Sequence, residues 1–293
     1  MYQDTHYLIP EGTEVNLKNY DPEFKGDYKS KKDAEARLEK DITELKELQE
    51  IFYASNQFSL LIVLQAIDTA GKDGVIKHVM SGLNPSGVTV HGFKAPTGIE
   101  TEHDFLWRCN KVLPPKGNIA IFNRSHYEEV LVTRVHPEYI LKQGIPGITK
   151  VEDIDKKFWQ QRYEQINNFE KTLTETGTHI LKFFLYLSKD EQKKRFLDRI
   201  DTPDKNWKFS SGDIKERGFW DEYMKAYEEA LSNTSKKKSP WFIIPANNKW
   251  YSRLVIANII KHYLKDLNLT YPKLDESEKE KLSEVKNILL SEK

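Results

Sequence analysis

Short apolar runs alternate along the chain with longer stretches in which apolar residues recur every three or four positions. The short runs predict strands at residues 60–64, 87–94, 118–122, 180–187 and 241–244. The longer stretches predict amphipathic helices at residues 34–52, 75–83, 99–113, 154–176, 190–200, 212–231 and 250–264. Strands that alternate with helices favour a parallel sheet covered on both faces. The pattern therefore predicts an α/β fold with five parallel strands in three layers, α/β/α.

Three regions lie outside this alternation. Residues 1–58 comprise a polar arm followed by the first helix, and residues 189–238 contain charged helices that leave the sheet between its last two strands. Residues 270–293 predict an appended helix, with Ser277 and Glu280 as a capping box, lying on the body or on a partner subunit. Because we find no repeat and no low-complexity linker, we expect one domain over residues 1–293.

Composition excludes several classes of protein. The chain has 45 basic and 45 acidic side chains, so no overall field favours nucleic acid, and a polyanion would need a local basic track. No apolar stretch is long enough to span a bilayer, and the N-terminus lacks the pattern of a signal peptide. The single cysteine, Cys109, suits a reducing compartment. We expect a cytoplasmic protein without nucleic-acid or membrane partners.

The stretch at residues 60–79, LLIVLQAIDTAGKDGVIKHV, has the layout of a phosphate-binding loop between a strand and a helix. In such loops main-chain N–H groups surround phosphate oxygens and a lysine, here Lys72, reaches the outer phosphates. The motif is imperfect, because Ala66 replaces its first glycine and Asp73 replaces its Ser/Thr. The residues expected to contact phosphate here are Ala70, Gly71, Lys72, Asp73 and Gly74.

Asp68 lies in the middle of this loop, where a carboxylate would repel phosphate unless a divalent cation bridged the two. We interpret Asp68 as a metal ligand or as the base that orients the attacking phosphate. The alternative is an ordinary turn in which Asp68 caps the following helix.

Polar residues also follow two other predicted strands, and the carboxyl ends of parallel strands meet at one edge of a sheet. Lys94 follows the second strand, and Asn123 and Arg124 follow the third. Arg124 could grip a phosphoryl oxygen, and Glu128 or Glu129 could hold a metal ion. The alternative is that Arg124 and Glu128 form an exposed helical ion pair.

Further basic residues are spaced through the predicted helices and, taken singly, could be ordinary surface charges. Three of them lie between the last two strands, where nucleotide kinases carry a mobile lid that closes over phosphates. The candidates for phosphate binding are Lys77, Arg134, Arg162, Lys205, Lys208 and Arg217.

Several long motifs resemble the family-2 polyphosphate kinases over residues 29–267. They are AIDTAGKDG, HGFKAPTGIETEHDFLWR, IFNRSHYEEVLVTRVH, INNFEKTL, LKFFLYLSKDEQKKRF, DKNWKFSSGDIKER and PWFIIPANNKW. The resemblance implies a P-loop kinase fold with a helical lid, and HDFLWR and NRSHYE are similar to the one-domain subgroup. It matches Asp68, Gly71 and Lys72 to the Walker A loop. It also matches Asn123, Arg124, Glu128 and Glu129 to the Walker B region. Lys205, Lys208 and Arg217 match the lid.

The resemblance implies transfer of the terminal phosphoryl group of inorganic polyphosphate to nucleotides, with Mg²⁺ or alternatively Mn²⁺. The expected acceptors are ADP and AMP, with GDP and GMP as further candidates, and the reaction is reversible. Asp68, Lys72 and Arg124 are the expected catalytic residues, and Asp68 with Glu128 or Glu129 the metal ligands. The alternatives are an ATP-dependent nucleoside monophosphate kinase and a non-catalytic polyphosphate-binding protein. The terminal helices suggest a homo-oligomer.

Overall fold

The computed structural model describes residues 6–208 and 210–292. The strands are β1 (Leu8–Ile9), β2 (Ser59–Gln65), β3 (Val88–Gly92), β4 (Ile119–Asn123), β5 (Thr178–Tyr186) and β6 (Trp241–Pro245). The α-helices are α1 (Lys31–Ser55), α2 (Lys72–Val79), α3 (Trp107–Asn110), α4 (Glu128–Val135), α5 (Glu138–Leu141), α6 (Lys156–Glu175), α7 (Lys189–Asp201), α8 (Ser211–Gly218), α9 (Trp220–Thr234), α10 (Lys249–Asp266) and α11 (Glu276–Ser291). Short 3₁₀ helices lie at Leu17–Asn19, Pro85–Gly87, Gly98–Glu102, Val151–Asp153 and Pro203–Lys208.

The strands form one sheet in the order β1-β6-β5-β2-β4-β3. The pairings among β2 to β6 are parallel, which confirms the predicted α/β fold, whereas β1 pairs antiparallel with β6. The prediction of five strands, all parallel, was therefore wrong by one edge strand. β1 has only two residues and lies in the predicted arm, so no alternation of apolar and polar residues could have marked it as a strand.

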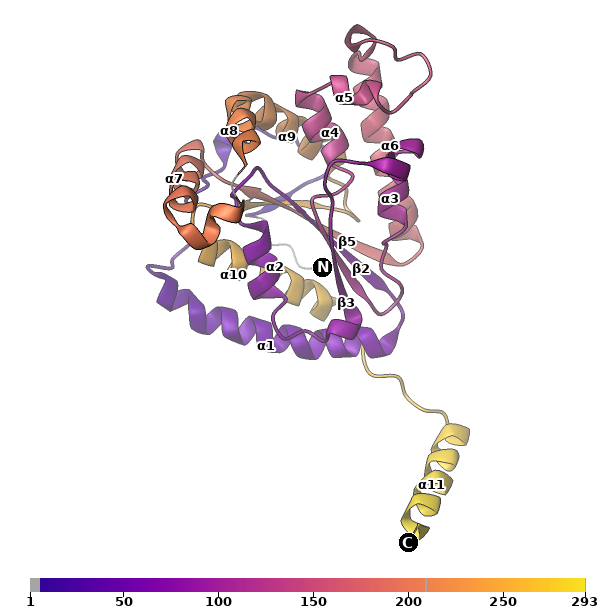
Figure 1. Ribbon diagram of the computed structural model, residues 1–293. Coiled ribbons are helices and arrows are strands. Elements are labelled where there is room, and N and C mark those ends of the chain that lie inside the picture. Colours follow the sequence, from indigo (N-terminus) through magenta and orange to yellow (C-terminus); the bar gives the residue numbers. More distant parts are fainter. Residues whose placement is uncertain (1–5, 209, 293) are drawn as a thin grey trace.

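The central strand β2 is buried on both faces and separates two hydrophobic cores. Leu60, Ile62 and Leu64 pack into the core formed with α1, α2 and α10. Leu61 and Val63 pack into the core formed with α4, α6 and α9. Figure 1 shows these two sets of helices on opposite sides of the sheet. The unbroken apolar run of β2 follows directly from this position.

Two predicted helices are interrupted. The stretch at 99–113 forms a 3₁₀ turn and the short α3, because His103 is extended (φ −114°, ψ 169°) and the Asp104 carboxylate accepts a hydrogen bond from the Leu106 N–H (2.9 Å). The stretch at 212–231 forms α8 and α9, which are separated at Phe219. α9 packs on α4 and buries Tyr227 in the core, so it belongs to the layer over the sheet.

The last helix, α11, extends away from the body of the molecule (Figure 1), and its residues are exposed. Its capping box consists of Asp275 and Glu278, because the helix begins at Glu276, so the predicted box of Ser277 and Glu280 was wrong. A homo-oligomer, a cytoplasmic location and the division into a core, a lid and an appended helix stay predictions. Within residues 6–208 and 210–292, no helix combines the length and apolar character needed to cross a membrane.

A buried ion pair joins β5 to α6. The ammonium of Lys182 donates hydrogen bonds to Glu170 (2.5 Å), to the hydroxyl of Tyr127 (2.9 Å) and to the carbonyl of Thr234 (2.8 Å). Burial would raise the pKa of Glu170, but Lys182 and a hydrogen bond from His126 lower it to about 2. Glu170 is therefore ionised at neutral pH, and Tyr127 holds the start of α4 against this pair.

We expect Glu170→Gln to lower the free energy of unfolding by about 3–5 kcal/mol, because it leaves the Lys182 ammonium buried without a counter-charge. Denaturant unfolding monitored by tryptophan fluorescence measures the change. The double variant Glu170→Met/Lys182→Met serves as the control and should recover most of the loss, because it removes both charges. A loss below about 1 kcal/mol in the single variant would contradict this role of the ion pair.

Candidate active site

The predicted phosphate-binding loop joins β2 to α2. Thr69 and Gly71 have positive φ angles of 65° and 112°, a conformation that glycine adopts readily and threonine rarely. Gly71 is the N-cap of α2, and no side chain caps this helix. The alternative in which Asp68 caps α2 was therefore wrong.

Lys72 is folded back over this loop. Its ammonium donates a hydrogen bond to the carbonyl oxygen of Ala66 (2.8 Å). Burial and the guanidinium of Arg124 lower the pKa of Lys72 to about 8, although the nearby carboxylate of Asp68 acts in the opposite direction. Lys72 therefore carries a charge at neutral pH that a bound anion would stabilise further.

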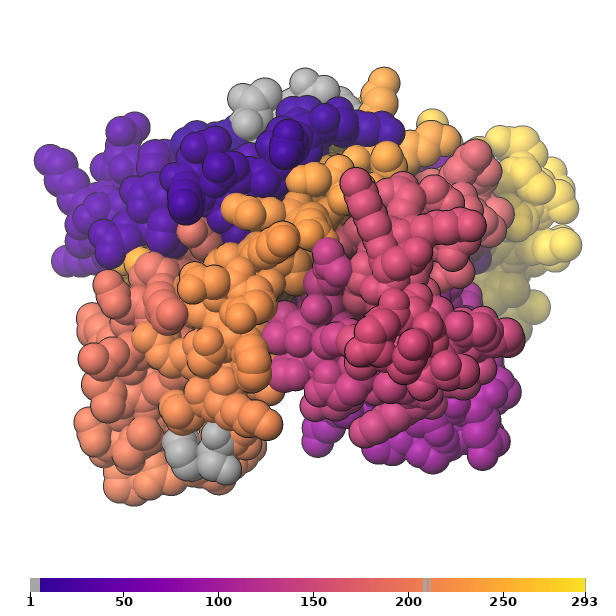
Figure 2. All heavy atoms as spheres, turned by 90° about the horizontal axis from the view of Figure 1, so that it is seen from above, coloured from indigo at the N-terminus to yellow at the C-terminus, as the bar shows by residue number. Residues whose placement is uncertain are grey.

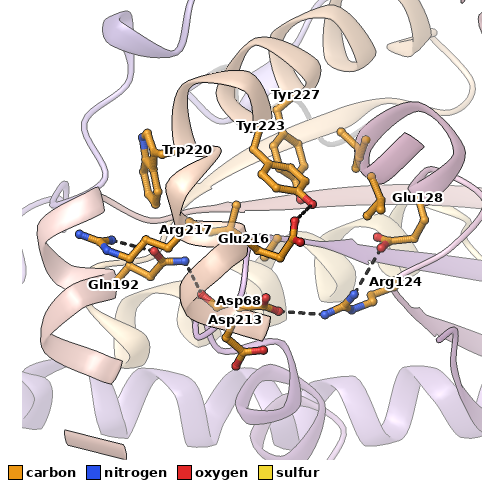
Figure 3. Close-up of a pocket in the computed structure, with 14 residues that line it drawn as sticks. Asp68, Arg124, Glu128, Gln192, Asp213, Glu216, Arg217, Trp220, Tyr223 and Tyr227 are labelled. Carbon is orange, nitrogen blue, oxygen red and sulfur yellow. Dashed lines mark hydrogen bonds and ion pairs between the residues drawn. The ribbon is translucent and has the colours of Figure 1, made fainter. Parts of the chain in front are cut away.

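Arg124 lies between two carboxylates at the end of β4. One Nη atom is 2.8 Å from Asp68 Oδ1, and the other is 3.4 Å from Glu128 Oε2 (Figure 3). Its backbone is strained, with φ at 64°, and its N–H donates to the carbonyl of Leu64 on β2 (3.0 Å). Arg124 and Glu128 thus form the ion pair that the alternative interpretation expected. The pair is not an ordinary exposed one, because the Glu128 side chain is only 16% exposed and Asp68 binds the same guanidinium. Burial opposes the charge, yet both carboxylates raise the pKa of Arg124.

The segment that carries Arg124 is anchored in the core on its far side. The hydroxyl of Ser125 accepts hydrogen bonds from the Gln65 side chain of β2 (3.0 Å) and from the Tyr127 N–H (3.1 Å). His126 contacts Glu170 (3.4 Å), and the Tyr127 hydroxyl donates to the same carboxylate (2.7 Å). The buried ion pair with Lys182 thus fixes the turn that presents Arg124.

The two acidic residues at the start of α4 point in different directions. Glu128 faces Arg124, whereas Glu129 is buried beside Gln143, which donates a hydrogen bond to it. Burial raises the pKa of Glu129, although the guanidinium of Arg162 partly offsets the effect. Of the pair, Glu128 is the one whose carboxylate shares a guanidinium with Asp68.

A basic cleft of about 450 Å³ opens over the phosphate-binding loop. Four loop residues predicted to bind phosphate line it together with Lys72, namely Ala70, Gly71, Asp73 and Gly74. Asn123 also lines it and donates a hydrogen bond to Asp73 (3.0 Å). The cations around the basic cleft are Lys72, Lys94, Arg124, Arg199, Lys249 and Arg253.

Sequence reasoning missed three of these cations: Arg199, Lys249 and Arg253. Lys249 and Arg253 lie one turn apart at the start of α10, directly after β6. β6 is a parallel strand of the same sheet, so its carboxyl end lies at the same edge as those of β2, β3 and β4. The sequence signal for both residues is therefore their position shortly after the apolar run at 241–244.

Two further cavities adjoin the basic cleft, and Arg124 lines all three. The α3–α5 cleft has a volume of about 360 Å³ and is lined by residues that include Lys94, Phe105, Arg108, Glu128, Glu129, Tyr139 and Lys142. The lid pocket lies under α8 and α9 and is lined by residues that include Asp68, Glu128, Gln192, Asp213, Glu216, Arg217 and Trp220 (Figure 3). Seen from above, a notch separates the lobe of α7 and α8 from the lobe of α3 to α6 (Figure 2).

Other predicted phosphate-binding residues lie outside these cavities. Arg134 is paired with Glu229 (2.9 Å), and Lys77 is exposed on α2. Arg162 is buried over the ring of Phe105, with 4.1 Å between its guanidinium carbon and the ring centre. Neither guanidinium needs a phosphate to satisfy it.

The predicted lid residues have separate environments. Lys205 is exposed and pairs with Asp198 (2.8 Å). Arg217 lines the lid pocket and donates hydrogen bonds to Gln192 (2.8 Å) and to the carbonyl of Lys189 (2.7 Å). The side chain of Lys208 lies outside the described part of the structure.

Carboxylates around Arg124 suit a hard divalent cation. Burial and the neighbouring Asp68 carboxylate raise the pKa of Asp213, so negative charge is crowded at this point. Among the described residues, no group of three His, Cys, Asp or Glu side chains forms a complete metal cage. Mg²⁺ is commonly held by one or two carboxylates together with substrate phosphates and water, and Asp68 and Glu128 fit that requirement.

Comparison with known proteins identifies the family. The model of the family "Polyphosphate kinase 2 (PPK2)" matches residues 28–273. The chain belongs to the polyphosphate kinase 2 family. This confirms the resemblance found in the sequence motifs.

Two relatives and one solved structure match along nearly their whole length. An "ADP-polyphosphate phosphotransferase" of Rhodopseudomonas palustris is 45% identical over 284 residues, covering 97% of both chains. An "AMP/ADP-polyphosphate phosphotransferase" of Meiothermus ruber is 43% identical over 270 residues, covering 91% of this chain and 94% of the relative. The crystal structure of polyphosphate kinase 2 from Arthrobacter aurescens matches with a TM-score of 0.83 at 41% identity, covering 94% of each chain.

We predict that Lys72 titrates near pH 8, because burial and Arg124 lower its pKa. NMR of protein labelled with ¹³C at the lysine ε-carbons measures the titration, and the Lys72→Arg variant identifies the signal by its loss. The ammonium should be present below pH 8 and lost above it. A Lys72 signal that shows no titration below pH 10 would contradict the described burial.

Proposed function

We propose that this protein transfers the terminal phosphoryl group of inorganic polyphosphate to ADP and AMP, forming ATP and ADP, with GDP and GMP as further acceptors. The reaction is reversible. Membership of the polyphosphate kinase 2 family and the printed names of the relatives support the donor and the acceptors. The observation that carries the proposal is the position of Arg124, which lines both the basic cleft and the α3–α5 cleft.

The basic cleft suits the donor. Inorganic polyphosphate is a linear chain of negative charges, so it needs a row of cations and no pocket for a base. The cleft offers cations from the phosphate-binding loop, from the end of β4 and from α7 and α10. They account for a polyanion site in a chain whose overall charge is zero.

The α3–α5 cleft suits the acceptor nucleotide. Its volume lies within the range typical of small-molecule sites, and its lining combines aromatic rings with charged groups. Phe105 and Tyr139 could contact the nucleoside, while Lys94 and Arg124 are near enough to both clefts to contact its phosphates.

The residues of the chain mainly position phosphates and neutralise their charge. Phosphoryl transfer passes through a loose transition state in which charge accumulates on the transferring group. Lys72 and the N–H groups at the start of α2 bind the donor, and Arg124 neutralises the group that passes between the clefts. Arg217, Lys205 and Lys208 belong to the segment that would close over the phosphates and exclude water.

A divalent cation, Mg²⁺ or alternatively Mn²⁺, would be held by Asp68 and Glu128. When bound, it would supply positive charge that offsets the negative charge of the phosphates. Asp68 is then a metal ligand, and Glu129 is not. Both carboxylates lie beside the Arg124 guanidinium, at 2.8 Å and 3.4 Å, so the cation would be held next to the arginine that is proposed to contact the phosphoryl group.

A donor–acceptor matrix tests the proposed function. Each assay contains either polyphosphate or ATP as the sole donor and one acceptor, which is AMP, ADP, GMP or GDP. Each pair is assayed with Mg²⁺ and again after Mg²⁺ has been removed by chelation. We expect phosphorylation of ADP and AMP with polyphosphate, and loss of turnover on chelation, measured by chromatography of the nucleotides. Phosphorylation of AMP with ATP but not with polyphosphate would indicate an ordinary nucleoside monophosphate kinase. No turnover with any pair would indicate a binding protein.

A further inference from the structure

A buried arginine of α7 holds the phosphate-binding loop by its main chain. Arg195 is only 6% exposed, and it lines none of the three cavities around Arg124. Its Nη1 atom donates hydrogen bonds to the carbonyl oxygens of Thr69 (3.1 Å) and Ala70 (3.0 Å). The guanidinium therefore contacts the loop from behind, away from the basic cleft.

The remaining donors of this guanidinium are also occupied. Nη2 donates to the carbonyl oxygens of Ala246 (2.6 Å) and Asn247 (2.9 Å), directly after β6. Nε donates to Glu191 (2.9 Å). Since a guanidinium has five N–H groups, five acceptors satisfy it completely. Arg195 has no donor left for a phosphate, and unlike Arg124 and Arg199 it does not line the basic cleft.

These bonds fix the direction of a peptide that faces the ligand. The carbonyl of Ala70 points toward Arg195, so the N–H of the same trans peptide, which belongs to Gly71, points the opposite way. Gly71 lines the basic cleft. The positive φ angles of Thr69 and Gly71 show that this loop is held away from the conformations most residues prefer.

The same helix carries contacts to the lid. Gln192 donates a hydrogen bond to the carbonyl of Asp68 (3.2 Å) and accepts one from Arg217 of α8 (2.8 Å), in a row that Figure 3 displays. Arg199 pairs with Asp213 of α8 (3.1 Å). α7 thus lies between the loop and α8, with Arg195 fastening it to the loop.

We propose that Arg195 is a positioning residue for phosphoryl transfer. It clamps the carbonyls of Thr69 and Ala70 so that the Gly71 N–H and the start of α2 are aimed at the donor phosphate before it binds. The inference rests on the proposed function and deepens it. Donors fixed in advance avoid reorganisation during the reaction, and small displacements of such groups are costly.

Arg195→Ala tests the clamp. We expect kcat with polyphosphate to fall roughly 10²-fold, because the loop peptide is free to rotate, while the KM for ADP stays near the wild-type value. The variant leaves a guanidinium-sized space lined by carbonyls, so added guanidinium ion should restore part of the activity. The affinity for tripolyphosphate, measured by calorimetry, should fall and recover in parallel, which gives a readout independent of turnover.

Two further variants keep the test decisive. Arg195→Lys retains the charge but offers three donors without the planar fork, so it should fold and still lose most of kcat. Arg37→Ala removes an arginine that pairs with Asp41 on α1, and it should match the wild type and gain nothing from guanidinium.

The outcomes separate this inference from the proposed function. A wild type that does not phosphorylate nucleotides with polyphosphate refutes the function, and the tripolyphosphate affinities then decide on the clamp alone. An active wild type with a near-normal Arg195→Ala variant refutes only the clamp. A loss of activity that added guanidinium does not restore would also refute the clamp. So would a rise in the KM for ADP as large as the fall in kcat, because both results indicate general damage to the fold.

Discussion

The charge on Arg124 is the constraint on which the site depends. Its guanidinium is partly buried, lines three cavities at the end of β4 and is flanked on two sides by Asp68 and Glu128. The two carboxylates in turn lie close to Arg124 and Lys72, whose positive charges offset theirs. The positive and negative charges of the cluster therefore stabilise one another.

The fold brings these groups together through strand order. β2 and β4 are neighbours in the sheet, so Asp68 and Arg124 meet although 56 residues separate them along the chain. The Arg124 N–H bonds to β2, and the turn after it is held by the buried pair of Lys182 and Glu170. On the other side, α7 supports the phosphate-binding loop. The cluster is therefore supported from the sheet on one side and from α7 on the other.

Much of this arrangement could be predicted from the sequence because its signals are local. Apolar runs located the five parallel strands, and strand ends located Asp68, Lys72, Asn123 and Arg124. β1 was missed because two residues are too few to show an alternation of apolar and polar positions. The helix predicted at 99–113 was too long, because a polar side chain within the segment interrupts it. Both errors concern structure that tertiary contacts or side-chain hydrogen bonds decide.

The basic residues show the limit more sharply. The sequence gives the positions of the arginines but not the hydrogen-bond and ion-pair partners of their guanidinium groups. Arg134 and Arg162 were candidates for phosphate contact, yet their guanidinium groups have partners within the protein. The basic cleft is instead lined by three residues that were not predicted to bind phosphate, Arg199, Lys249 and Arg253. The difference depends on side-chain direction within helices, which only the packed structure specifies.

The central claim is that Arg124 neutralises the phosphoryl group as it passes between the two clefts. The rate of a single turnover from polyphosphate to ADP in Arg124→Ala tests it most directly, with ADP affinity measured alongside. The account predicts a rate lower by about 10²–10³-fold, with ADP binding nearly unchanged. A variant that folds and transfers the phosphoryl group at close to the wild-type rate would contradict it.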